Sequence, residues 1–513
     1  MYLTNSKTIK ELDGQAVEEW NIPSSVLMEN AGRSAVGIIK EQIDELPESA
    51  VVVAGKGNNG GDGLVIARRL IDSGVRIKTY VIGDRDSLTE QTTRNLEILE
   101  RMTNEVFFTE PNDEQMLADL NSNPPLIIDA IFGIGISGPL RGDYSELISQ
   151  INNSESIVVA VDIPSGLPGD TGDPEGEAVK ADITATMGLV KIGTLLPEAF
   201  KYVGEQFVAS VDYPRVMMED HKAIWRLLRD KYVRDLLPTR NVAAHKGEFG
   251  RLLVVGGSTS MTGAPILSAK SALRSGTGLV YLAVPESLSE IFSTNVVEGL
   301  NISLPDKDGK LTQDSHLELK EVTEDKDAVA IGPGIGRHKA TAELVRNYLS
   351  GISVPAVIDA DAIPAYSNCE QDLESLSDAV LTPHPGELAK LIGSSPAQVD
   401  KKRFDLVPEL AREFGITLVL KGVPTVVSSP SGRTSVASCP NSGLAKGGSG
   451  DILTGLIGSF MAQGLKPYEA AQLGTWLHCR IGEVGVNEYG VDYLQPGDLI
   501  GFISRVLKEW RNS

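Results

Sequence analysis

Cysteine is scarce in this 513-residue chain, and Cys369, Cys439 and Cys479 are far apart, with no CxxC pair. This spacing argues against a disulfide framework or a cysteine zinc site and favours a reducing compartment, for which we expect the cytoplasm. Long apolar runs are also missing. The first residues carry Asp and Glu at helical spacing where a secretory peptide needs an unbroken apolar run, and no later segment could span a bilayer. We therefore expect no membrane partner.

Positive charge is in deficit. The chain has 47 Lys and Arg against 69 Asp and Glu, a net charge of -22. Such an excess would repel nucleic-acid phosphates, so we expect no nucleic-acid partner. The length exceeds what one hydrophobic core usually serves, which predicts two domains, residues 1–220 and 221–513.

Short apolar runs recur along both halves, and most are followed by a segment with helical periodicity. These runs are residues 50–54, 126–132, 157–161, 252–255, 328–331, 356–358 and 417–420. Continuous Val, Ile and Leu runs of this length are typical of strands buried on both faces, and their alternation with helices predicts α/β domains with parallel sheets. Between the halves, residues 213–241 predict a connecting helix that ends near Pro238. Ligands of such folds bind beyond the carboxyl ends of the strands.

A glycine-rich turn, GKGNNGGDG at residues 55–63, joins the strand at residues 51–54 to a helix. Glycines allow close backbone approach, and the free N–H groups at a helix start can hold a phosphate. The turn matches GxGxxG, so an ordinary dinucleotide fold and a tight turn without a ligand both stay open. Asn58, Asn59 and Asp62 favour a ligand, because a conventional pyrophosphate loop needs only backbone groups.

Two more polar strand ends follow in the same half. DAIFGIGISGP (residues 129–139) contains a second GxGxxG, and a third strand ends at DIPSG (residues 162–166). Aspartates at strand ends often only form turns, and that interpretation of Asp129 or Asp162 alone stays open. Together, Asn59, Asp129 and Ser165 offer only oxygen ligands with one formal charge, which suits a monovalent or hard cation.

These motifs, with MENAG at residues 28–32, resemble the NAD(P)HX epimerases over nearly all of residues 1–215. The resemblance implies a Rossmann-like three-layer sandwich in which Asn59, Asp129 and Ser165 hold K+. It implies that the hydrated cofactor is bound by Asn58, Asn59, Gly60, Gly61, Asp62, Gly133, Ile134, Gly135, Ile136, Ser137, Gly138, Pro139 and Asp162. Because the substrate carries its hydroxyl and the ring nitrogen on one carbon, inversion needs proton transfer at that oxygen, and Asp162 is our candidate for it.

The C-terminal half has its own series of strand ends, GGS at residues 256–258, GPGIG at 332–336, DADA at 359–362 and TPHPGE at 382–387. His384 lies between two prolines, which hold it extended, although a lone histidine is more often a surface or satisfied residue. NSGLAKGGSGD at residues 441–451 runs into a strongly apolar helix, whose free N–H groups form an anion hole. Asp451, in the first helical turn, is either a cap or a base for in-line attack on a phosphoryl group.

This arrangement resembles the ribokinase-like fold, a three-layer sandwich with a catalytic Asp after a GxG turn. HKGEFGRLLVVGGS, MTGAP, GPGIG, TPHPGE, KGVPT and GLAKGGSGDILTG narrow the resemblance to the NAD(P)HX dehydratases over about residues 225–510. The resemblance implies that Ala264, Gly334, His384 and Asp451 contact the hydrated cofactor. It implies that Lys421, Gly422, Val423, Pro424, Thr425 and Gly450 hold the adenine nucleotide. Lys446 and Ser442 stand where the family usually has Thr and Pro, a difference that concerns fine tuning near the phosphates.

The two resemblances together imply a bifunctional repair enzyme. Its substrates are NADHX and NADPHX, its co-substrate is ADP with Mg2+ at the dehydratase site, and it forms a homo-oligomer. Asp451 takes the proton of the C6 hydroxyl, phosphoryl transfer makes a leaving group, and elimination returns the reduced cofactor. A vitamin or sugar kinase and a non-catalytic NAD(P)-binding regulator are the alternatives, although the first leaves the N-terminal half without a role.

Overall fold

The computed structural model describes residues 1–135, 138–140, 142–219, 224–241, 243–376 and 378–512. The chain divides into two compact units, Met1–Trp225 and Arg226–Ser513. The expected domain boundary at residues 220 and 221 lies outside the described residues.

The N-terminal unit is built around a parallel sheet whose strand order among the described residues is β4-β3-β2-β5-β6-β7-β9. The strands are β2 (Ser49–Ala54), β3 (Arg76–Ile82), β4 (Val106–Thr109), β5 (Leu126–Ala130), β6 (Ile157–Val161), β7 (Ile183–Met187) and β9 (Glu205–Ala209). A short parallel pair, β1 (Tyr2–Thr4) and β8 (Val190–Lys191), accompanies it. The chain leaves β2 toward β3 and β4 and returns to β5 on its other side. The switch point of the sheet, where ligands of such folds bind, thus lies between β2 and β5.

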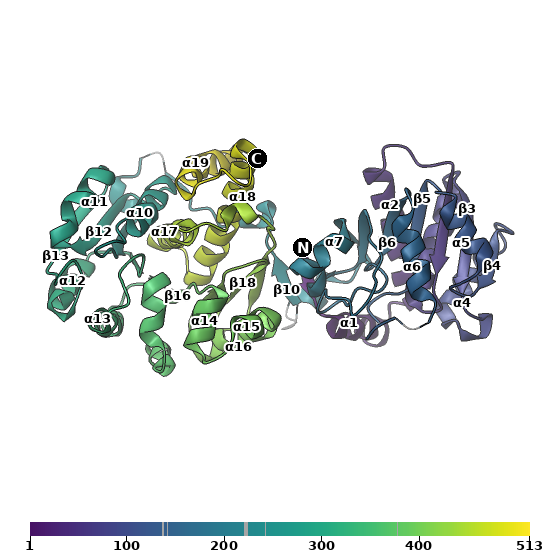
Figure 1. The fold of residues 1–513 in the computed structure, drawn as a ribbon, viewed down its shortest axis with the longest axis horizontal. Helices are drawn as coiled ribbons and strands as arrows, with labels where there is room; N and C mark the ends of the chain where they lie inside the picture. Colours follow the sequence, from purple (N-terminus) through teal and green to yellow (C-terminus); the bar gives the residue numbers. More distant parts are fainter. Residues whose placement is uncertain (136–137, 141, 220–223, 242, 377, 513) are drawn as a thin grey trace. The chain divides into compact units, whose positions relative to one another are not determined.

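Helices cover both faces of this sheet (Figure 1). The side chains of α2 (Ser24–Gln42), α3 (Asn58–Asp72) and α4 (Glu90–Leu99) pack on one face, with Val52 and Ile128. Those of α5 (Glu114–Asn121) and α6 (Tyr144–Asn153) pack on the other, with Val51 and Ile127. The remaining helices are α1 (Ser6–Glu18), α7 (Phe200–Val203) and α8 (Arg215–Glu219). Because consecutive residues of the central strands bury opposite faces, β2, β5 and β6 are almost entirely apolar, as the sequence predicts.

The C-terminal unit contains a sheet with the order β13-β12-β11-β14-β15-β16-β17-β18-β19-β10 among the described residues. The pairs from β13 to β17 are parallel, and β17, β18 and β19 are antiparallel neighbours. The strands are β10 (Ile224–Leu227), β11 (Arg251–Val255), β12 (Leu279–Pro285), β13 (Leu300–Leu304), β14 (Ala328–Ile331), β15 (Ala356–Ile358), β16 (Ala379–Leu381), β17 (Thr417–Leu420), β18 (Thr425–Ser428) and β19 (Thr434–Ala437). The switch point lies between β11 and β14.

One face of this sheet packs against α10 (Gly263–Arg274), α11 (Ser289–Asn295), α17 (Ser449–Ala462), α18 (Pro467–Tyr489) and α19 (Pro496–Asn512). Figure 1 shows α12 (His316–Thr323), α13 (Lys339–Leu349), α14 (Pro385–Leu391), α15 (Pro396–Lys401) and α16 (Arg403–Glu413) on the opposite face. Helix α17 is apolar around almost its whole circumference, and it is buried between α10, α18 and the sheet. Both units are thus three-layer α/β sandwiches, which confirms the predicted fold class and the predicted strands.

The predicted connecting helix over residues 213–241 is wrong. This segment holds α8, β10 and α9 (Asp230–Arg234), so no single helix crosses it. Arg226 and Leu227 pair in parallel with Ser435 and Val436 of β19. Trp225 and Leu227 alternate into the interior, as in a strand. A partner more than 200 residues away in the sequence therefore decides the conformation here.

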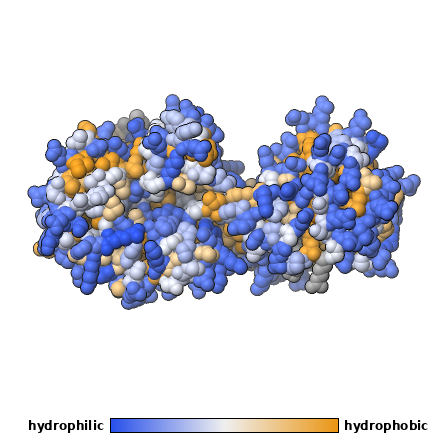
Figure 2. Space-filling view, viewed as in Figure 1, coloured by the Kyte–Doolittle hydropathy of each residue, from blue (hydrophilic) through white to orange (hydrophobic). Residues whose placement is uncertain are grey.

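None of the described helices combines the length and the apolar character that a membrane span requires. The face drawn in Figure 2 is mostly hydrophilic, and hydrophobic side chains form separate small groups on it.

Candidate active sites

The glycine-rich turn of the N-terminal unit lies at its switch point, where Gly55 N donates to Ala130 O at 2.9 Å. Three of its glycines are required by internal packing. A Cβ on Gly55 would lie 2.0 Å from Ile131 O, one on Gly60 1.8 Å from Gly55 O, and one on Gly63 2.4 Å from the Cβ of Ala130. A Cβ on Gly57, in contrast, would meet no atom within 4 Å. At Gly57 the turn is therefore not packed against other residues.

The polar residues of this turn lie in the first turns of α3. Asn58 is exposed and accepts a hydrogen bond from Thr89 Oγ1 at 2.9 Å. Asn59 lies against the second loop, since a Cβ on Gly133 would be 3.1 Å from its Oδ1, and its buried Nδ2 has no partner among the described residues. Burial, with the nearby charges of Asp162 and Asp13, raises the pKa of Asp62 well above its usual range. Gly61 faces Met28, inside the unit.

Asp129 and Ser165, two of the predicted cation ligands, are in direct contact and fully buried. Ser165 donates to Asp129 twice, from its N at 2.8 Å and from its Oγ at 2.5 Å. Ser165 Oγ also accepts from Phe132 N at 2.9 Å, which ties the two strand ends together. Burial raises the pKa of Asp129 to about 6, against the hydrogen bonds that lower it. No ion pair to Asp129 occurs among the described residues, so a bound cation would offset the cost of burying its charge.

The second loop continues away from this contact. Gly133 lies against Asn59, and Ile134 lies near Gly169, whereas added Cβ atoms on Gly135 and Gly138 would meet open space. Pro139 is exposed. The predicted binding residues Ile136 and Ser137 lie outside the described residues.

Asp162, the predicted acid–base group, forms a buried ion pair with Lys191, which the sequence analysis missed. Asp162 Oδ1 accepts from Lys191 Nζ and, at 3.0 Å, from Met187 N. Asp13 and Tyr213 belong to the same electrostatic cluster, and Tyr213 OH donates to Asp13 Oδ1 at 2.5 Å. Burial raises the pKa of Asp13, against the hydrogen bond from Tyr213. A lysine inside the apolar run LVKIG is the one signal that could have indicated this pair.

In the C-terminal unit two predicted loops meet at the switch point. Gly257 N donates to Pro333 O at 3.0 Å, and Ser258 Oγ donates to Gly334 O at 2.8 Å. Gly334 has a φ of +61°, and a Cβ on it would lie 3.4 Å from the Cβ of Ala264. The predicted substrate contacts Ala264 and Gly334 are therefore neighbours.

The next strand ends meet through Asp359, which the sequence places at a strand end without a role. Asp359 is 1% exposed, and its carboxylate accepts from Lys421 Nζ at 2.8 Å, Thr382 Oγ1 at 2.7 Å and Thr454 Oγ1 at 2.6 Å. Burial alone would raise its pKa, but the Lys421 ammonium and these hydrogen bonds hold the pKa below its usual range. Glu387 lies 3.8 Å from Lys421 Nζ. Asp359 thus fixes the ammonium of Lys421 at the carboxyl edge of the sheet.

Asp451 lies in the first turn of α17, beside this network. Burial and the charges of Asp359, Asp361 and Glu387 raise its pKa to about 7, against the effect of Lys421. Its carboxylate has no hydrogen-bond partner among the described residues, so it is available to a substrate. A Cβ on Gly450 would lie 3.4 Å from Lys421 Nζ, which places the lysine directly against the start of α17. An ammonium and free backbone N–H groups together make a site for phosphate.

The other predicted residues of this unit surround the same edge. His384 is the N-cap of α14, with its Nδ1 accepting from Gly386 N at 3.0 Å and its side chain 55% exposed. Gly422 has a φ of +133°, Val423 and Pro424 complete the turn, and Thr425 Oγ1 donates to Gly422 O at 2.9 Å. His478, which the sequence analysis missed, lies 3.1 Å from Ser449 Oγ at the α17 N-terminus, and burial lowers its pKa to about 4.

Lys446 points away from the anion hole. Its Nζ donates to the backbone oxygens of Asp492 at 2.8 Å and Leu494 at 2.6 Å. Ser442 lies in a short 3-10 helix, Ser442–Leu444, before the glycine turn. Lys446 therefore stabilises the segment at residues 492–494.

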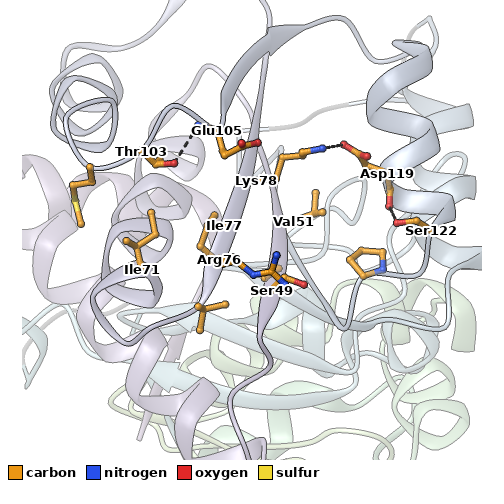
Figure 3. Close-up of a pocket in the computed structure, with 14 residues that line it drawn as sticks. Ser49, Val51, Ile71, Arg76, Ile77, Lys78, Thr103, Glu105, Asp119 and Ser122 are labelled. Carbon is orange, nitrogen blue, oxygen red and sulfur yellow. Dashed lines mark hydrogen bonds and ion pairs between the residues drawn. The ribbon is translucent and has the colours of Figure 1, made fainter.

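A cavity of about 510 Å³ lies elsewhere in the N-terminal unit (Figure 3). Its lining residues come from the amino-terminal halves of β2 and β3, among them Ser49 and Arg76, from nearby loops, and from Ile71 of α3 and Asp119 of α5. The ammonium of Lys78 is already paired with Asp119 there, at 2.6 Å. The cavity lies at the end of the strands opposite to the predicted catalytic residues, so it does not belong to the candidate site.

Each unit thus places an aspartate at the carboxyl edge of a sheet, near the N-terminus of a helix that can hold an anion; Asp162 is buried and Asp451 is partly buried. This arrangement suits proton transfer on a phosphate-bearing substrate. The fold and the sites define an α/β enzyme of the nucleotide-binding class with two active sites.

The comparisons with known proteins agree with this class and narrow it. Residues 24–193 match the family described as YjeF-related protein N-terminus, and residues 252–505 match NAD(P)H-hydrate dehydratase. The bifunctional NAD(P)H-hydrate repair enzyme Nnr of Moorella thermoacetica is 38% identical, with 99% of this chain and 97% of the relative covered. The enzyme of that name from Escherichia coli is 30% identical, with 97% and 92% covered. The chain belongs to the family of bifunctional NAD(P)H-hydrate repair enzymes, which confirms the resemblance.

A solved structure supports the fold of the C-terminal unit. The ADP/ATP-dependent NAD(P)H-hydrate dehydratase of Bacillus subtilis, co-crystallised with ATP and Mg2+, has a TM-score of 0.50 and 28% identity. It covers 56% of this chain, and 99% of that chain is covered.

Proposed function

We propose that this chain repairs hydrated nicotinamide cofactors in two steps. The N-terminal unit interconverts the R and S forms of NADHX and NADPHX. The C-terminal unit dehydrates the S form to NAD(P)H while ADP is converted to AMP and phosphate. Family membership supports both activities, and the observation that carries the second is Asp451, a carboxyl group without a hydrogen-bond partner among the described residues, with a pKa of about 7 at an anion-binding helix start.

In the dehydratase step Asp451 accepts the proton of the C6 hydroxyl, because a base with a pKa near the working pH is the most effective. The phosphoryl group passes from ADP to that oxygen, and the ring nitrogen then drives elimination of phosphate. Lys421, Gly422, Val423, Pro424, Thr425 and Gly450 hold the nucleotide in this proposal. Ala264, Gly334 and His384 orient the hydrated ring against Asp451. Asp359 keeps Lys421 in place.

Magnesium fits the charge of this edge. Asp359, Asp361, Glu387 and Asp451 contribute negative charge there against the ammonium of Lys421. No group of three or more His, Cys, Asp or Glu that could hold a metal occurs among the described residues, so the nucleotide phosphates would supply most ligands. Glu387 is the candidate protein ligand, since the carboxylate of Asp361 is bound by Arg337 and by Gly336 N. The ion would neutralise charge on the phosphates.

In the epimerase step Asp162 moves a proton at the C6 hydroxyl, and the turn at residues 58–62 with the loop at residues 133–139 holds the cofactor. Asn59, Asp129 and Ser165 fit potassium, because Asp129 is a fully buried carboxylate without an ion pair among the described residues, and the Oδ1 of Asn59 and the Oγ of Ser165 are neutral oxygen ligands. The ion would supply positive charge beside the anionic substrate.

We place the enzyme in the cytoplasm, which its three free thiols support. We also propose a homo-oligomer, on the family resemblance. Light scattering of the purified chain measures the assembly directly.

The test uses chemically hydrated NADH, with the absorbance of the reduced nicotinamide as the readout and ADP, ATP or no nucleotide added. Full recovery of both epimers that depends on added nucleotide, with release of phosphate, is the expected result. A stable phosphorylated product would favour the kinase alternative. Cofactor binding without phosphate release would favour the regulator.

A further inference from the structure

Asp162 is held in an unusual conformation. Its φ is +70°, and Ile163 N donates to Val161 O at 2.9 Å, so Asp162 is the central residue of a γ-turn with positive φ. Such turns are rare and strained in residues other than glycine. Strain of this kind persists where the surroundings fix it, and it is concentrated at functional sites. The backbone conformation at Asp162 is therefore imposed by the fold.

Lys191 is the group that fixes the carboxylate. Its side chain is 1% exposed, and its three donors are used by Asp162 Oδ1, Met187 O at 2.8 Å and Thr186 Oγ1 at 3.4 Å. The ammonium has no donor left, and burial keeps it from direct contact with a substrate. Asp162 is the carboxylate that Lys191 contacts directly, and the positive charge of Lys191 also opposes the rise that burial causes in the pKa of Asp62 and Asp13.

The two carboxylate oxygens of Asp162 differ in their hydrogen bonds. Oδ1 accepts from both Lys191 Nζ and Met187 N, whereas no donor among the described residues contacts Oδ2. Asp62, Asp13 and Tyr213 are the other titratable groups of the cluster, and none of them donates to Asp162. A carboxylate with one oxygen fixed and one free has a defined direction for proton transfer.

We propose that Lys191 is the positioning residue of the epimerase site: it occupies Oδ1 of Asp162 and leaves Oδ2 as the oxygen that exchanges the substrate proton. This inference rests on the proposed epimerase function. Since Lys191 acts through Asp162, its removal should lower kcat and leave the KM for the hydrated cofactor nearly unchanged.

The experiment is a double-mutant cycle on epimerisation of hydrated NADH by the full chain, with Lys191→Met, Asp162→Asn and both together. We expect Asp162→Asn to lose about 10²- to 10⁴-fold in kcat and Lys191→Met about 10- to 100-fold. The double variant should lose no more than Asp162→Asn alone. The double variant has neither charge of the buried pair, so it remains informative if Lys191→Met alone does not fold. In that case Lys191→Gln replaces Lys191→Met as the single variant.

Two controls distinguish a specific loss of epimerisation in Lys191→Met from a general loss of structure. Dehydration of the S form by the same molecules reports the intact C-terminal unit. Lys78→Met removes another lysine paired with an aspartate in this unit, 2.6 Å from Asp119, and should leave kcat unchanged. Independent, multiplied losses in the double variant, or an unchanged kcat in Lys191→Met, would overturn the inference. Absence of epimerisation in the unmodified chain would instead refute the proposed function.

Discussion

Replacement of Asp451 by Asn should separate the two activities. Asparagine keeps the size of the side chain and removes the basic oxygen, so dehydration should lose about 10²- to 10⁴-fold in kcat, or about 3 to 5 kcal/mol of transition-state stabilisation. Epimerisation should be unchanged, because Asp451 belongs to the C-terminal unit. The expected product is a mixture of epimers that stays hydrated.

The pH dependence of the unmodified enzyme gives a second measure of the same residue. A pKa of about 7 means that about half of the Asp451 carboxyl groups are ionised at pH 7 and about a tenth at pH 6. Since the base must be ionised, kcat/KM should fall about fivefold between these values. Asp359→Asn removes a negative charge that raises this pKa, so the acid limb should move to lower pH.

The assay is recovery of absorbance from the purified S form with saturating ADP, at pH values from 5.5 to 8.5, roughly the range around the expected midpoint. Melting curves of Asp451→Asn verify that the variant is folded. If Asp451→Asn kept a third or more of the unmodified rate, or if kcat/KM were flat across this range, the role of Asp451 as base would be refuted.

Three further predictions follow from the loops. The pKa of Asp129 is raised from 3.8 to about 6, so its contribution to folding stability, about 3 kcal/mol, is present below pH 3.8 and is lost as the pH rises through 6. KCl, but not tetramethylammonium chloride, should restore the melting temperature at pH 7. Equal melting curves in the two salts would contradict a cation site. Gly60→Ala should lower the melting temperature, because its Cβ would lie 1.8 Å from a backbone oxygen, whereas Gly57→Ala should melt normally; equal effects would refute the packing argument. Lys446→Ala should change the KM for ADP by no more than about twofold, whereas Gly450→Ala should raise that KM severalfold. A larger rise in Lys446→Ala than in Gly450→Ala would mean that Lys446 contacts the phosphates.

The sequence predicted the central strands well, because both faces of those strands are buried and almost every residue in them is apolar. It also predicted which loops meet, since the carboxyl ends of parallel strands share one edge. Ser165 and Asp129 are 36 residues apart in the chain and in direct contact in the structure. A polar strand end was a sufficient signal for both.

Residues whose role depends on a distant partner could not be found in this way. Lys191 belongs to a two-residue strand, and only the fold brings it to Asp162. The sequence indicated Asp359 as a strand end, but not the hydrogen bond that it accepts from Thr454, 95 residues further on. The helix predicted around Trp225 was wrong for a related reason, because pairing with β19 decides the conformation there in spite of the helical periodicity. Local patterns carry no information about such partners.

The packing of the first glycine turn affects how relatives of this chain should be interpreted. Gly55, Gly60 and Gly63 are fixed by contacts within the protein, and a chain that had lost all catalysis would still need them to fold. Their presence in another sequence is therefore a marker of architecture. On the proposed epimerase mechanism, Asn59 and Asp162 are the positions whose loss would distinguish a pseudoenzyme from a working epimerase.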